Sequence, residues 1–125
     1  MAMSDLATQL VEQAKEYQGK SQGEQEYLLA MALADIQSEG TVPDLGPRDF
    51  WIRARDDLVR QILHQRVAVQ GVAGVAAQQV AMWADSGDFS SVRFQIALAI
   101  LTAMVTDAVL NAAGGGGSDE NNQST

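Results

Sequence analysis

Arginine and aspartate residues on apolar helix faces are the side chains whose types and spacing could do chemistry in this chain. Arg55 and Arg66 project into the apolar stripe of a predicted helix, and Asp107 is the one charge between Phe94 and Ala113. A charge buried in an apolar seam needs a partner, because an unpaired buried charge costs several kcal/mol. The pattern therefore predicts a buried or interfacial ion pair of Asp107 with Arg55 or Arg66, and Asp35 is a second candidate acid.

Such a pair would set the register of an assembly rather than catalyse a reaction. Two alternatives stay open. The arginine side chains could reach the rim of the apolar stripe while Asp107 faces solvent, or the site could bind an anionic ligand. Destabilisation by Asp107→Ala would support the pair, and an unchanged melting temperature would contradict it.

Other residue types that support catalysis form no convergent pattern. The chain has no cysteine, which excludes disulfides, zinc–thiolate sites and thiol catalysis, and His64 is a lone histidine on the polar side of its helix. Asp85–Ser91 lacks the alternating ligands of a calcium loop. Neither Gly71–Gly74 nor the terminal glycines precede the Gly-Lys-Ser/Thr of a phosphate loop. We predict no enzyme activity, no metal and no cofactor.

Apolar residues at helical spacing predict an all-α fold, and no strand alternation or hairpin signal occurs along the chain. A first helix is expected over Asp5–Gln18, with Ser4 as its N-cap. A second is expected from Ser21 to Gly40. Ser21 and Glu24 have the spacing of a capping box, in which two side chains satisfy free N–H groups at the helix start.

The third helical region begins near Arg48, after the connector Thr41–Pro47, and its pattern extends to Trp83. Gly71 and Gly74 weaken that pattern by about 1 kcal/mol each relative to alanine. We therefore expect either a kink or break near Gly71 or one long helix with a weak middle.

The last helix, Phe94–Ala113, is apolar all round and is expected to be the most buried element. Asp88 or Ser90 is its predicted cap. The fold class is thus a compact bundle of four or five helices with a buried C-terminal helix. Residues 1–113 form a single domain, and residues 114–125 form a flexible, glycine-rich polar tail.

Charge and aromatic residues indicate the kind of partner. The net charge of −8 argues against direct nucleic-acid binding. Residues 1–43 hold two basic and seven acidic residues, whereas 48–66 hold five arginines and three acids. These segments could attract within the fold or between copies. Phe50, Trp51 and Trp83 are candidate partner contacts, because aromatic side chains are common at binding hot spots.

The leading hypothesis is a non-enzymatic structural or interaction protein in a homo-oligomeric or larger assembly, such as a particle or virion component. It rests on Phe94–Ala113 and Val67–Ala84, whose apolar surface exceeds what the other short helices are expected to cover. One alternative is an acidic adaptor, chaperone or inhibitor that binds a basic protein. Another is a membrane-inserting hairpin of these two segments. The N-terminus lacks a secretory signal, which favours the cytoplasm or a particle.

Overall fold

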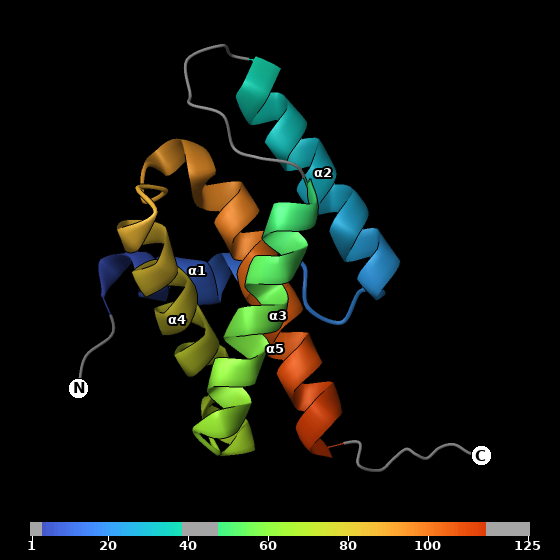
Figure 1. Ribbon diagram of the computed structural model, residues 1–125, viewed down its shortest axis with the longest axis vertical. Coiled ribbons are helices and arrows are strands. Elements are labelled where there is room, and N and C mark those ends of the chain that lie inside the picture. The colour runs from blue at the N-terminus through green and yellow to red at the C-terminus, as the bar shows by residue number, and fades with distance from the viewer. Residues whose placement is uncertain (1–3, 39–47, 115–125) are drawn as a thin grey trace.

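The computed structural model describes residues 4–38 and 48–114, and these residues form helices and no strand (Figure 1). The predicted all-α bundle with a buried C-terminal helix is confirmed. The predicted connector Thr41–Pro47 and the tail beyond Gly114 lie outside the described residues. The elements are α1 Asp5–Ala14, α2 Gln22–Ser38, α3 Arg48–His64, η1 Val69–Gly71, α4 Val72–Ser86, η2 Val92–Phe94 and α5 Gln95–Gly114, where η1 and η2 are 3-10 turns.

Serine hydroxyls cap the first two helices, as the sequence predicts. The Oγ of Ser4 accepts a hydrogen bond from the Ala7 N–H at 3.1 Å, and the Oγ of Ser21 accepts from the Glu24 N–H at 3.1 Å. The α1 helix ends at Ala14, four residues before the predicted end. A hydrogen-bonded turn follows it, and Gly19 then reverses the chain with a φ of +83°, a conformation that favours glycine.

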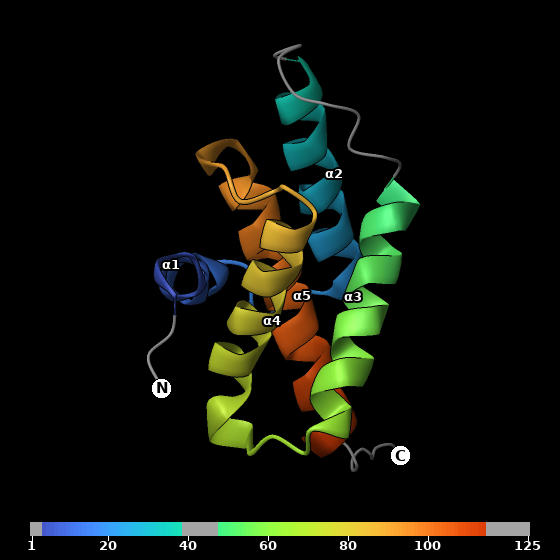
Figure 2. The same cartoon turned by 60° about the vertical axis from the view of Figure 1, so that its left-hand side comes forward.

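The third helical region breaks before Gly71, so the single long helix is wrong and the predicted break is confirmed. The α3 helix ends at His64, and Arg66 takes a left-handed conformation with a φ of 57°. Gly71 lies in the following 3-10 turn, and Val72 begins α4. Figure 2 shows α3 and α4 side by side, joined at the foot of the molecule. The reversal lets the Val72–Ser86 segment cover the same core as α3.

The start of the last helix differs from the predicted cap. Ser91 holds the N-cap position of η2 and makes no side-chain hydrogen bond there. Asp88 has a φ of +64° and belongs to the preceding turn, so neither Asp88 nor Ser90 is the cap. The Phe94 N–H closes the 3-10 turn on the Ser91 carbonyl oxygen at 3.1 Å, and α5 follows directly.

The α5 helix is the centre of the bundle. All ten residues from Ala97 to Thr106 are buried, and α1, α2, α3 and α4 all contact this helix. Figure 2 shows α1 end-on, crossing the direction of the other helices. The hydroxyls of Thr102 and Thr106 donate to the carbonyl oxygens of Leu98 and Thr102 at 2.8 Å, which satisfies these buried polar groups.

The other helices therefore cover the middle of the C-terminal helix, whereas Ile96 near its start and Val69 and Met82 in the Val67–Ala84 segment stay exposed. Among the described residues, Val92–Ala112 is the one helical stretch long and apolar enough to cross a membrane. Within its most apolar window, 67% of the residues are buried inside the bundle, as expected for a core helix. The predicted second span, Val67–Ala84, does not meet the same length and hydropathy criteria.

Candidate functional site

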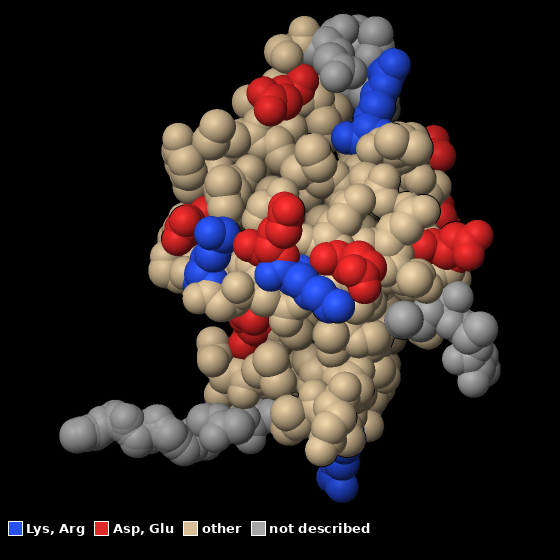
Figure 3. Space-filling model, turned by 180° about the vertical axis from the view of Figure 1, so that it is seen from behind, with Lys and Arg blue, Asp and Glu red and all other residues tan. Residues whose placement is uncertain are grey.

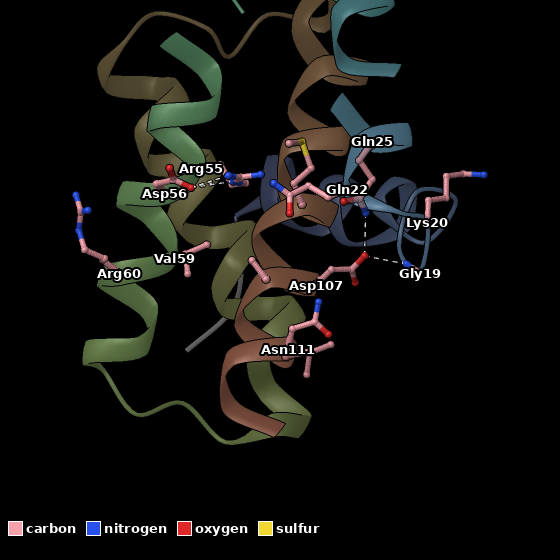
Figure 4. A pocket seen from close by; sticks show the side chains of 13 residues that line it. Gly19, Lys20, Gln22, Gln25, Arg55, Asp56, Val59, Arg60, Asp107 and Asn111 are labelled. Atoms are coloured by element: carbon pink, nitrogen blue, oxygen red, sulfur yellow. Dashed lines mark hydrogen bonds and ion pairs between the residues drawn. The ribbon is translucent and has the colours of Figure 1, made fainter. Parts of the chain in front are cut away.

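An open polar pocket of about 500 Å³ lies where the start of α2, the middle of α3 and the end of α5 meet (Figure 4). Sites between helices are a common place for ligands in helical bundles. The lining combines charged and amide side chains with apolar ones: Gly19, Lys20, Gln22, Gln25, Arg55, Asp56, Val59, Arg60, Met104, Asp107, Ala108, Leu110 and Asn111.

Asp107 accepts hydrogen bonds from two groups at the edge of the pocket. Its Oδ2 accepts from the Gly19 backbone N–H and from the side-chain amide of Gln25, each at 2.8 Å (Figure 4). Gln25 is only 3% exposed, and its Nε2 also donates to the carbonyl oxygen of Tyr17 at 2.9 Å. Asp107 therefore ties α5 to the chain reversal between α1 and α2.

The predicted ion pair of Asp107 with Arg55 or Arg66 does not form within the chain, because backbone and amide N–H groups take that place. A pair across an interface between copies stays a prediction. Arg55 lines the same pocket but its guanidinium contacts Asp56 at 2.8 Å and Glu26 at 3.6 Å. The side chain of Arg55 is 12% exposed, so this arginine is nearly buried on the apolar face of α3, as the sequence predicts.

Arg66 and Asp35 are not part of the pocket. Arg66 is exposed in the turn just after α3, and Asp35 is exposed near the end of α2. Within residues 4–38 and 48–114, neither side chain forms an ion pair. Glu26 of α2 instead pairs with Arg48 at 3.3 Å as well as with Arg55, so the opposite charges of the two segments meet inside one fold.

All three phenylalanines and both tryptophans form one aromatic cluster. Trp51 is fully buried at its centre, with ring centroids 5.2 Å from Trp83 and 5.5 Å from Phe89. Trp83 stacks on Phe89 at 5.0 Å, and Phe94 meets Phe89 edge-on at 5.5 Å. Because α4 folds back along α3, residues from both ends of the third helical region meet here.

A groove of about 340 Å³ runs along this cluster on the α3–α4 side of the bundle. Phe50 and Trp83, whose centroids are 6.1 Å apart, line it and are partly exposed. Arg53 also lines the groove and is exposed, with no ion pair in the part of the chain that the structure describes. Trp51 is 0% exposed, so its assignment as a partner contact is wrong. Phe50 and Trp83 stay candidates.

A third feature is a line of exposed residues on one side of α2. Tyr27 is 63% exposed and Met31 is 47% exposed, and Asp35 follows one turn later. Positions four apart lie on one side of a helix. The sequence shows this four-residue spacing. It does not show which side of α2 packs against α5, and therefore which side stays exposed.

Charge is mixed rather than segregated on the back of the molecule. Figure 3 shows basic and acidic side chains side by side in a band across that face, with mostly uncharged surface above and below. Among the described residues, no group of three His, Asp or Glu side chains could hold a metal ion, and His64 is exposed. Comparison with protein-family models, curated proteins and solved structures found no match.

Proposed function

We propose that this chain is a non-enzymatic interaction protein that assembles with copies of itself, head to tail. The α2 face formed by Tyr27, Met31 and Asp35 enters the groove of Phe50 and Trp83 on the next copy. The observation that carries this proposal is the presence of two separate surfaces. One is the exposed apolar pair Tyr27 and Met31 on α2, and the other is a groove in which the rings of Phe50 and Trp83 lie among the charged side chains of Arg53, Arg60, Asp56 and Asp57.

The apolar parts of the two surfaces match in chemistry. Tyr27 and Met31 are the two large apolar side chains that α2 exposes among the described residues. Tyrosine and methionine both make favourable contacts with aromatic rings, worth about 0.3–1.5 kcal/mol per pair beyond area burial. The groove presents two such rings, from Phe50 and Trp83.

Each surface also carries one charged side chain that has no ion pair among the described residues, since the acids of the groove, Asp56 and Asp57, pair with Arg55 and Arg60. Asp35 is exposed on the same side of α2 as Tyr27 and Met31, and Arg53 is exposed at the groove. Neither has an ion pair within the chain as described, whereas Arg55 and Arg60 pair with Asp56 and Asp57. Asp35 of one copy is therefore free to pair with Arg53 of the next.

In a dimer formed in this way, one copy keeps a free α2 face and the other copy keeps a free groove. Such heterologous contacts generate rings or open filaments rather than closed two-fold dimers. The buried α5 helix has no part in this contact, so assembly does not require the core to open.

The test is absolute mass by light scattering from about 10 µM to about 1 mM, since small contacts of this type are weak. We expect mass to rise with concentration for the wild type. Tyr27→Ser combined with Met31→Ser should keep the chain monomeric, whereas Ile96→Ser, at another exposed apolar residue, should not. A wild-type chain that is monomeric throughout would contradict the proposal.

Charge reversal tests the proposed Asp35–Arg53 pair. Asp35→Arg and Arg53→Glu should each lower the mass at a given concentration, and the double variant should regain part of it. Both residues are exposed, so the fold is expected to tolerate the changes. Equal losses that simply add in the double variant would show that these two side chains do not meet.

An adaptor for a basic protein is the second candidate. Exposed acids on α1, at Asp5 and Glu12, and in the turn that follows it, at Glu16, favour it. Such binding would weaken steeply with salt, because exposed charges are screened within about 8 Å at physiological ionic strength. Self-association through aromatic and apolar contacts would depend much less on salt.

A further inference from the structure

We infer that the Asp107 pocket binds an alkyl chain that ends in an ammonium or guanidinium group. This inference concerns the α2–α3–α5 pocket of Figure 4 and does not rest on the proposed self-association. It follows from the distribution of charge, from two unused acceptor atoms and from the apolar residues beside them.

Asp107 is the carboxylate of this pocket that lacks a counterion. Each basic side chain of the lining is matched by a different acid: Arg55 by Glu26 and Asp56, Arg60 by Asp57, and Lys20 by Glu24 at 3.6 Å. In the described part of the chain, Asp107 forms hydrogen bonds to N–H groups but no ion pair. An incoming cation would supply the missing charge.

Two acceptor atoms in the pocket have no donor among the described residues. Both hydrogen bonds to Asp107 end on Oδ2, which leaves Oδ1 free. Gln25 donates through Nε2 to two acceptors, Asp107 and the Tyr17 carbonyl, so its amide cannot be flipped without placing oxygen against oxygen. The remaining amide atom, Oε1, is therefore an acceptor. It has no donor among the described residues, although Gln25 is only 3% exposed.

The arrangement of the side chains leaves room for a cation at the centre. Figure 4 shows Lys20 and Arg60 pointing away on opposite sides of the pocket, whereas Asp107 lies between them. Val59, Met104 and Leu110 add an apolar lining that suits an alkyl chain. A metal ion is a poorer fit, because Ca²⁺ and Mg²⁺ need about six oxygen ligands, and of the two carboxylates in the lining Asp56 is already paired with Arg55.

The site can be tested by titrating the full chain and recording ¹H–¹⁵N NMR spectra. The probes are 1,4-diaminobutane and agmatine, with 1,4-butanediol as the uncharged counterpart and sodium acetate as the anion. We expect the Gly19 amide and the Gln25 side-chain amide to shift with saturation for the two cations alone, because both groups bond to Asp107. A peptide, acetyl-Gly-Lys-Gly-amide, separates a protein side chain from a free amine as the source.

Variants connect the binding to Asp107. Asp107→Asn should weaken diaminobutane binding at least tenfold, whereas Asp85→Asn, which removes an exposed acid elsewhere, should leave it unchanged. Arg60→Gln should tighten binding, because it removes a nearby positive charge from an exposed position, and it also serves if Asp107→Asn does not fold.

Three results would overturn the inference. They are equal shifts with butanediol, saturable shifts with acetate instead of the amines, or weaker diaminobutane binding by Arg60→Gln. Binding of the diamine but not of the peptide would assign the site to a free amine, and tighter binding of the peptide would assign it to a lysine of a partner.

Discussion

The hydrogen bonds of Asp107 give a prediction that separates the structure from the ion pair expected on sequence grounds. The perturbation is a pair of double-mutant cycles. One combines Asp107→Ala with Gln25→Leu, and the other combines Asp107→Ala with Arg55→Met. The first pair is in direct contact at 2.8 Å, whereas Asp107 and Arg55 share a pocket without an ion pair.

The magnitude follows from what each substitution leaves unpaired. A hydrogen bond to a charged group contributes about 1.5–3 kcal/mol, and a buried donor left without its acceptor costs about 1–3 kcal/mol. Asp107→Ala strands one N–H of buried Gln25, while the exposed Gly19 N–H can turn to water. We therefore expect a loss of about 2–3 kcal/mol in the free energy of unfolding.

In the Gln25→Leu background, Asp107→Ala leaves no buried amide N–H without an acceptor. The coupling energy between Asp107 and Gln25 is thus expected to be about 1–2 kcal/mol, and that between Asp107 and Arg55 below about 0.5 kcal/mol.

Urea unfolding followed by circular dichroism measures these quantities, since a small helical chain of 125 residues is expected to unfold in one step. Thermal unfolding should agree, with Asp107→Ala lowering the melting temperature by about 8–12 °C. A coupling above about 1 kcal/mol between Asp107 and Arg55, with none between Asp107 and Gln25, would refute the reasoning.

Three further predictions concern the core and the turns, all read from urea unfolding. Trp51→Ala should cost about 3–5 kcal/mol because the ring is fully buried at the centre of the aromatic cluster, and a cost below about 1 kcal/mol would contradict that placement. Gly87→Ala should lower the free energy of unfolding by about 1–3 kcal/mol, since a Cβ there would lie 2.6 Å from Cδ2 of the Phe89 ring. The near-UV circular dichroism spectrum should also change, because the Phe89 ring must move from its stacked position on Trp83. Gly23→Ala should stabilise by about 0.5 kcal/mol because nothing lies within 4 Å of the added methyl, and destabilisation would show that α2 begins later.

Local signals predicted the helices well. Ser4 and Ser21 cap α1 and α2 because an N-cap hydroxyl acts over three residues and needs no tertiary contact. The burial of α5 followed from its all-round apolar composition. The break after α3 was placed late because it depends on the left-handed Arg66, for which a non-glycine sequence gives no signal.

The candidate sites depended on contacts that local patterns do not contain. The charged residues suggested that Asp107 needs a partner, which was correct, but its donors are a backbone N–H and a buried amide. Phe50 and Trp83 were read as opposite ends of one helical region. They meet because the chain reverses between them, and that reversal also buries Trp51 while leaving the groove open.

The most direct test of head-to-tail assembly mixes two variants that are each expected to be monomeric. One carries Tyr27→Ser and Met31→Ser and keeps its groove, and the other carries Arg53→Glu with Trp83→Ser and keeps its α2 face; circular dichroism first establishes that both are folded. Light scattering of the mixture should give a limiting mass of twice the 13.4 kDa chain, because one intact α2 face and one intact groove remain and growth stops at two chains. A mixture that stays at 13.4 kDa while the wild type assembles would contradict the pairing of these two surfaces.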